Sequence, residues 1–445
     1  MKRLVPAAIL LAGLAGTFAV SAETDDGTSQ SQGNRTELRP QPIGLSGCAS
    51  SNCHGRSGRD TSPESAWRTS CTVWAARDPH ARAYDVLDPE KNAIAKKMQK
   101  AFPRLKEDPR CRACHSNPGI PAGREYEALR SEGVSCESCH GNAEFWVRTH
   151  TQMSMTDRHG LAELNDLGSR ASACAGCHVG SPGRDMNHDM IAAGHPKLNF
   201  EFASHLARLP RHWYERDRMT GEKRGPEFLL QAWAVGPFRA GESVRALSID
   251  RQSREQGRIW PELAEWNCYA CHHELLGKPW RSAAGFRLGE KAWTLSWPLG
   301  NVEAADALVP GLGRRIENGT KAVSTATGAQ RLNAVGQLAT LLRDSRPTNT
   351  GNNADRVFKS IEATKTISDW DSGYRIYLTL GVLETVRMAG KQPESAAIVA
   401  GFKELEKALN LPGHPKESTF DPNTVHSLIV KLTGELRKAW PESQK

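Results

Sequence analysis

Hydrophobic and polar positions divide this 445-residue chain into a short leader, a central region and a C-terminal region. The C-terminal region, residues 298–445, shows the clearest order, because hydrophobic side chains recur at three- and four-residue spacing, as in amphipathic helices. The last of these helices has Asp421 as its expected N-cap and Pro422 at its first position. Short connections between such helices predict a small helical bundle with no recognisable chemistry. The predicted helices cover residues 327–344, 354–366, 372–388, 394–409 and 422–438.

The leader is hydrophobic in its first part and polar in its second. Lys2 and Arg3 precede an apolar stretch, and a small-residue sequence follows that ends at Ala22. This arrangement predicts a signal peptide, residues 1–22, cleaved near Ala22 on export to the periplasm. An uncleaved membrane anchor is the alternative, but the apolar stretch is short. No later segment is long and apolar enough to span a bilayer, so no stable membrane insertion is expected after cleavage. Residues 23–40 are polar without periodicity and predict a flexible leader.

The central region, residues 41–297, has few long hydrophobic runs and is marked by a repeated motif. Cys-x-x-Cys-His occurs four times, and a fifth site has the same ends with two extra residues between its cysteines. Such a cysteine pair bonds to the two vinyl groups of a haem, and the histidine that follows is placed to bind the iron. The expected attachment residues are Cys48, Cys53, Cys111, Cys114, Cys136, Cys139, Cys174, Cys177, Cys268 and Cys271, and the expected iron ligands are His54, His115, His140, His178 and His272.

These motifs predict a multihaem c-type cytochrome with five covalently attached haem c groups, each holding an iron. The haems would supply much of the buried apolar surface, which agrees with the scarcity of hydrophobic runs. The predicted fold is mainly α: a multihaem cytochrome c domain with little regular sheet over residues 41–297, then the helical bundle domain over 298–445. Short helices are expected around the motifs, for example over residues 92–102 and leading into the last motif.

Cysteine usage and charge narrow this interpretation. The motifs use ten of the eleven cysteines, which leaves no disulfide framework and only Cys71, expected to be a buried packing thiol rather than a bridging or reactive one. The formal charge of +8 falls by two when Lys2 and Arg3 are removed, and haem propionates offset most of the remainder. Nucleic acid is therefore excluded as a partner. The surplus Arg and Lys side chains are expected to pair with propionates or to face redox partner proteins.

A second ligand decides what each haem does. A haem with two histidines can only pass electrons, whereas an open position can bind a small molecule. The central region holds eight histidines outside the motifs, a surplus that favours bis-histidine haems: His80, His150, His159, His188, His195, His205, His212 and His273.

Some of these histidines can be assigned from their neighbours. His188 is expected to serve the haem of Cys174 and Cys177 or a neighbouring haem, with His195 serving the other; a hydrogen-bonded turn is the alternative for both. His273 follows a motif histidine directly, so it points to a neighbouring haem or a propionate. The remaining assignments are weaker: His205 and His212 are interpreted as propionate or surface residues, and His159 is left undecided.

Residues 42–200 resemble a known family. The matching pieces are Gly47-Cys48 with Cys53-His54-Gly55, then Trp74 through Asp78-Pro79-His80 to Tyr84, then Val134 through Gly141 followed by His150. They are similar to the cytochrome c-554 family, named for a tetrahaem carrier that takes electrons from hydroxylamine oxidoreductase. The resemblance implies that His80 completes the haem of Cys136 and Cys139, and that His150 completes the haem of Cys48 and Cys53. This crossed pairing implies closely stacked haems and fast electron exchange.

The chain departs from that family in an expanded first motif, a fifth haem and the helical domain. In the named carrier the second haem lacks a distal side-chain ligand, so an open haem at Cys111 and Cys114 remains an alternative here. Electron transfer is the predicted function, because distal histidines are in surplus and no Cys-x-x-Cys-Lys motif is present. The alternative is a haem enzyme acting on a small nitrogen or sulfur compound at one open haem. The helical domain is a possible docking site for a redox partner.

Overall fold

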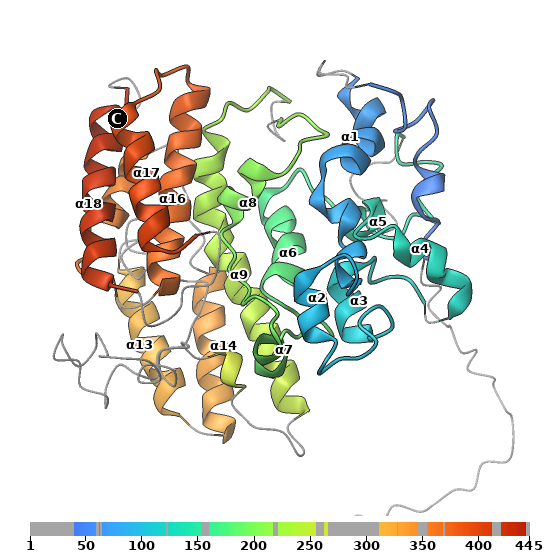
Figure 1. Cartoon of the computed structure of the whole chain (residues 1–445), viewed down its shortest axis with the longest axis horizontal. Helices are drawn as coiled ribbons and strands as arrows, with labels where there is room; N and C mark the ends of the chain where they lie inside the picture. Colours follow the sequence, from blue (N-terminus) through green and yellow to red (C-terminus); the bar gives the residue numbers. More distant parts are fainter. Residues whose placement is uncertain are drawn as a thin grey trace, which may run out of the picture. The chain divides into compact units, whose positions relative to one another are not determined.

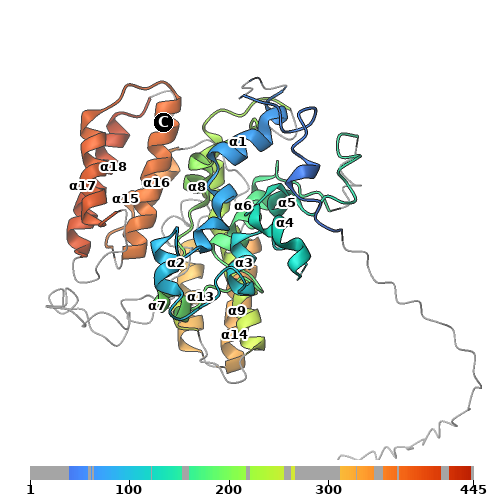
Figure 2. The same ribbon diagram turned by 45° about the vertical axis from the view of Figure 1, so that its right-hand side comes forward.

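The computed structural model describes residues 40–58, 62, 65–121, 123–152, 160–216, 221–254, 262–265, 311–326, 328–344, 354–367, 370–411 and 420–441. The described residues are mainly helical, which confirms the predicted fold class. Strand-like pairing among them is limited to two isolated bridges, Ser181 with Arg184 and Arg216 with Lys223. Figures 1 and 2 show this arrangement of short and long helices.

Short helices dominate the region that carries the predicted haem motifs. Its α-helices are α1 (Ser70–Arg77), α2 (Ala93–Met98), α3 (Pro109–His115), α4 (Glu127–Ser131), α5 (Cys136–His140), α6 (Leu167–His178), α7 (His188–Ala193), α8 (Phe202–Arg208) and the long α9 (Phe228–Ser253). Its 3-10 turns are η1 (Leu45–Gly47), η2 (Ala66–Thr69), η3 (Pro79–Arg82), η4 (Asp85–Leu87), η5 (Arg124–Tyr126) and η6 (Leu263–Glu265).

Side-chain caps explain where several of these short helices begin. Asn92 accepts backbone hydrogen bonds at the start of α2, and Asp166 does so at the start of α6. Asp108 caps α3, whose first residue is Pro109. A short helix has few internal hydrogen bonds, so a cap supplies a large share of its local stability. The helix predicted over residues 92–102 is shorter in the structure, since α2 ends at Met98.

The helices predicted in the C-terminal region are confirmed. The structure has α14 (Gly328–Asp344), α15 (Ala354–Glu362), α16 (Trp370–Ala389), α17 (Ala396–Ala408) and α18 (Pro422–Lys438). The side chain of Asp421 caps α18 by accepting a hydrogen bond from Asn423, with Pro422 at the first helical position as expected. A further helix, α13 (Leu312–Thr325), was not predicted.

One hydrophobic core joins helices from both sides of the predicted domain boundary. α9 packs against α6, α8 and α14, and α16 packs against α8 and α9. Phe202 of α8, Leu229 of α9 and Leu380 of α16 are almost completely buried in this shared core. The predicted boundary at residues 297 and 298 lies outside the described residues. Among the described helices, none combines the length and the hydrophobicity needed to cross a bilayer.

Candidate functional site

Three of the predicted haem motifs lie at the C-terminal ends of helices, and each helix ends at the histidine of its motif. α3 ends at His115, α5 at His140 and α6 at His178. Residues three and four positions apart share one face of a helix, so the two cysteines and the histidine of each motif point the same way. This is the arrangement by which two thioether bonds and one imidazole hold a haem. The expanded motif at residues 48–54 forms a turn after η1 instead, because its extra residues break the helical spacing.

Each motif histidine in the described residues lies beside a second histidine from a distant part of the chain. Imidazole nitrogens bind first-row metals at about 2 Å, so two rings on opposite sides of one iron have centroids roughly 6 Å apart. All four observed pairs fit this spacing, which is the geometry of a bis-histidine haem. The ring centroids are 6.1 Å apart for His54 and His150, 6.3 Å for His115 and His195, 6.5 Å for His140 and His212, and 6.0 Å for His178 and His80.

Hydrogen bonds orient several of these rings for metal binding. An imidazole that donates its Nδ1–H keeps the lone pair of Nε2 free for a metal, and the acceptor fixes the ring orientation. Four of the rings have Nδ1 2.8 Å from a backbone carbonyl oxygen: His54 with Trp67, His115 with Ala83, His150 with Val147, and His195 with Pro196.

Burial keeps the motif histidines in the form that binds a metal. It lowers the pKa of His140 and that of His178 to about 4. Burial also lowers the pKa of His115 and that of His212 below the ordinary histidine value. A neutral imidazole is the form that coordinates a metal, so these side chains need not lose a proton at neutral pH before binding iron.

The structure corrects the expected partner of His80. The resemblance implied that this residue completes the haem of Cys136 and Cys139, whose motif histidine is His140. In the structure His80 lies against His178, in the motif of Cys174 and Cys177. η3, which carries His80, packs against α1, and the His80 ring faces the ring of His178 at the end of α6.

His212, which the sequence suggested was a propionate or surface residue, takes the place opposite His140. A buried network next to it holds this part of the chain. The Arg170 guanidinium of α6 lies 2.6 Å from the carboxylate of Glu215, which also accepts a 2.7 Å hydrogen bond from the indole of Trp213. The sequence signal was therefore the Trp-x-Glu that follows His212, which only tertiary structure connects to Arg170.

The sequence left two alternatives for the haem of Cys111 and Cys114, a second histidine ligand or an open coordination position. His195 lies opposite the motif histidine His115, and the Nδ1 atoms of both rings lie 2.8 Å from backbone carbonyl oxygens. The geometry thus places a second imidazole where an open position would need free space. His188 was expected to serve the haem of Cys174 and Cys177 or a neighbouring haem. In the structure His80 is the ring opposite His178, and His188 begins α7, where its backbone N–H donates to Glu262 at 2.9 Å.

The attachment cysteines of different motifs lie next to one another. Cys136 donates a hydrogen bond to the Cys48 sulfur, which lowers the pKa of Cys48 and raises that of Cys136. Cys114 bonds in the same way to Cys177, and this bond lowers the pKa of Cys177 to about 6. Thioethers at these positions would therefore hold the first haem beside the third, and the second beside the fourth.

Two glutamates bring the first motif to the third. Glu137, inside the third motif and only 3 % exposed, accepts hydrogen bonds from the backbone N–H groups of Ile43 (3.0 Å) and Gly44 (2.8 Å). The same carboxylate accepts a 2.7 Å bond from Ala143. Glu132 accepts from the N–H of Leu45 with both oxygens. These bonds fix the segment that leads directly into the first motif.

Comparison with known proteins gives one family match. Residues 47–141, which contain the first three predicted motifs and His80, match the family described as cytochrome c554 and c-prime. The chain therefore contains a region of the cytochrome c-554 family. It is accordingly a haem-based electron-transfer cytochrome with covalently bound haem c and its iron. The search of curated proteins and the search of solved structures gave no significant match.

Some histidines and cysteines of this cytochrome lie outside the motifs and the four histidine pairs. His205 contacts His178 with a centroid distance of 5.0 Å, which is short for two rings on opposite sides of an iron. Its Nδ1 lies 2.9 Å from the carbonyl of Glu201, within α8. Cys71 is buried in α1, as expected for a packing thiol. The expected sites at Cys268, Cys271, His272 and His273, and the undecided His159, lie outside the described residues.

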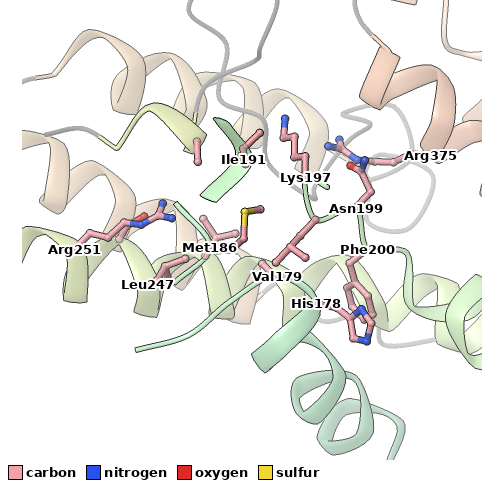
Figure 3. Close-up of a pocket in the computed structure, with 14 residues that line it drawn as sticks. His178, Val179, Met186, Ile191, Lys197, Asn199, Phe200, Leu247, Arg251 and Arg375 are labelled. Atoms are coloured by element: carbon pink, nitrogen blue, oxygen red, sulfur yellow. The ribbon is translucent and has the colours of Figure 1, made fainter. Parts of the chain in front are cut away.

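A pocket lies beside His178 in this cytochrome (Figure 3). Its wall is apolar at Val179, Met186 and Leu247, and it also carries cationic side chains. Lys197 pairs with Asp371 at 2.7 Å, so a residue of the segment before α8 is tied to α16. The other cations are Arg251, which pairs with Asp185 at 2.6 Å, and Arg375 of α16.

Proposed function

We propose that this cytochrome is exported to the periplasm and passes electrons between redox partner proteins through five haems, most of them bis-histidine ligated. The observation that carries this proposal is the set of four histidine pairs with ring centroids 6.0–6.5 Å apart. Each pair would hold one haem iron with two imidazoles, and a haem held in this way would transfer electrons without binding a substrate. The fifth haem rests on the motif of Cys268 and Cys271 alone.

The neighbouring thiols support a route between the haems. Cys48 lies beside Cys136, which links the haems of the first and third motifs. Cys139 of the third motif lies near Cys174 and Cys177 of the fourth, and burial, reinforced by these neighbours, raises the pKa of Cys139 to about 12. Cys114 contacts Cys177, which links the second motif to the fourth. The proposed order of haems along the route is therefore first, third, fourth and second.

The cationic residues of the pocket beside His178 fit haem propionates. Lys197 and Arg251 are each already held by a carboxylate, at Asp371 and Asp185. Guanidinium and ammonium groups fixed in this way can donate hydrogen bonds to a second carboxylate at low entropic cost. Because Arg375 belongs to α16, a propionate bound there would connect the helical domain to the haems. The proposal also includes docking of a redox partner on the helical domain, because this domain follows the haem motifs in the sequence and carries none of its own.

The proposal is tested by counting haems and by assaying turnover. The intact mass of the purified protein is expected to correspond to five haems, and a Cys268→Ser/Cys271→Ser variant to four. The reduced protein is expected to be oxidised rapidly by a soluble electron acceptor, and to give no sustained turnover of nitrite, hydroxylamine or sulfite. Sustained turnover of any of these compounds would support the alternative, a haem enzyme with one open iron.

A further inference from the structure

Asp78 makes a contact that sets His80 apart from the other candidate ligands. Its Oδ1 atom accepts a hydrogen bond from the His80 Nδ1–H at 2.8 Å and a second one from the His80 backbone N–H at 2.9 Å. Asp78 is only 3 % exposed, so water does not compete strongly for its carboxylate. The backbone bond makes Asp78 the N-cap of η3, and Pro79 begins that turn. Both bonds fix the ring that faces His178.

The other oriented rings meet neutral acceptors. His54, His115, His150 and His195 each place Nδ1 against a backbone carbonyl oxygen. Within the described part of the chain, His80 is the candidate ligand whose ring is bonded to a carboxylate. A carboxylate is a much stronger acceptor than a carbonyl, and it makes the coordinated imidazole a stronger electron donor. Electron donation to the iron stabilises the oxidised state and lowers the reduction potential of the haem.

We propose that Asp78 is a positioning residue that lowers the reduction potential of the haem held by Cys174, Cys177 and His178. The inference rests on the proposed pairing of His80 with His178. This haem lies between the second and third haems in the proposed route, so its potential sets the energy of the step between them. Arg184, whose positive charge lies near Cys177 and Cys139, acts in the opposite direction and limits the effect.

Asp78→Asn is the direct test, because an amide oxygen keeps the cap and the ring contact but removes the charge. The matched control is Asp421→Asn, which changes an Asp-Pro cap at the start of α18 in the helical domain. A His80→Ala variant first identifies the EPR signal of the haem in question, as the low-spin signal that is lost. Potentiometric titrations followed by EPR then report the potential of each haem in both Asn variants.

In Asp78→Asn, the signal identified with His80→Ala is expected to change its g values while staying low-spin, and its midpoint potential is expected to rise. The other haems and the Asp421→Asn control are expected to keep their potentials. Unchanged g values and potential in Asp78→Asn would overturn the inference while leaving the haem count and electron transfer intact. If His80→Ala instead keeps every low-spin signal, the ligand assignment on which the inference rests is wrong.

Discussion

The imidazole rings of His115 and His195 face each other with centroids 6.3 Å apart. The Nδ1 atom of each ring lies 2.8 Å from a backbone carbonyl, at Ala83 and at Pro196. These bonds leave both Nε2 atoms free for a metal between them. The pair matters because the second haem is the one that the named carrier of this family leaves without a distal side-chain ligand. A closed second haem favours electron transfer over catalysis.

Replacement of His195 tests this closure. His195→Ala is expected to convert one haem to the high-spin state and to create one site that binds nitric oxide, without changing the haem content. The matched control is His426→Ala in α18, whose ring donates to the carbonyl of Thr364 far from the motifs in sequence. Optical and EPR spectra of both variants check the prediction. An unchanged low-spin spectrum of His195→Ala would show that another group binds that iron.

Replacement of His212 tests the revised pairing at the third motif. His212→Ala is expected to make one haem high-spin, because this ring lies opposite His140. The same change in a Cys136→Ser/Cys139→Ser background is expected to add no high-spin signal, since the haem concerned is absent. A high-spin signal that persists in that background would assign His212 to another haem. His80→Ala in the same background is expected to add a signal, which distinguishes the two pairings.

The carboxylate of Glu137 is predicted to stabilise the junction of the first and third motifs. It accepts hydrogen bonds from three backbone N–H groups and is almost completely buried. In Glu137→Gln the amide nitrogen faces one of these donors, which is expected to reduce the free energy of unfolding by about 1–3 kcal/mol. Chemical denaturation of the holoprotein measures the change.

The control for Glu137→Gln is Glu144→Gln. Glu144 is exposed and accepts a 2.7 Å bond from the N–H of Gln41 in the same N-terminal segment. Its replacement is expected to change the free energy of unfolding by less than about 0.5 kcal/mol, as for most surface sites. Equal losses of stability in the two variants would contradict a specific role of Glu137.

Glu201 gives the stability a pH dependence. Burial raises the pKa of this carboxyl to about 7, from an ordinary value of 4.5. Between these two values the folded protein holds a proton that the unfolded chain has released. The stabilisation is therefore present below the lower value and is lost as the pH rises toward about 7. Glu201→Gln keeps an acceptor for the N–H groups at the start of α8 and is expected to flatten this decline.

Denaturation at several pH values between 4.5 and 7 measures the slope for the native chain and for Glu201→Gln. An identical slope in both proteins would show that Glu201 is ionised in the folded state and that other groups cause any decline. The Glu201 side chain accepts hydrogen bonds from the backbone N–H groups of Ala203 and Ser204.

Local patterns in the sequence predicted the parts of the structure that local interactions determine. The periodicity of residues such as Val425, Ile429 and Leu432 predicted α18, and Asp421 with Pro422 predicted where it begins. In the unpredicted α13, Leu312 and Ile316 are buried among the described side chains, and the apolar pattern around them is short. The motif histidines were likewise recognisable because their cysteines precede them directly.

The second ligands depend on contacts between distant residues, which spacing along the chain does not specify. His212 stands opposite His140 because Arg170 of α6 and Glu215 form a buried ion pair. His80 stands opposite His178 because η3 is packed next to α1 and meets the end of α6. A family resemblance that covers only part of the chain could not supply these contacts, since His178 and His212 both lie beyond residues 47–141.

The EPR spectrum of the oxidised holoprotein, recorded with and without nitric oxide and with the haem content known, tests the central claim most directly. The bis-histidine account predicts low-spin signals from the four haems of the described motifs and no change in them with nitric oxide. A high-spin signal that nitric oxide shifts, and that remains after Cys268→Ser/Cys271→Ser removes the fifth haem, would contradict it. Such a result would mean that at least one of the four histidine pairs does not close its haem.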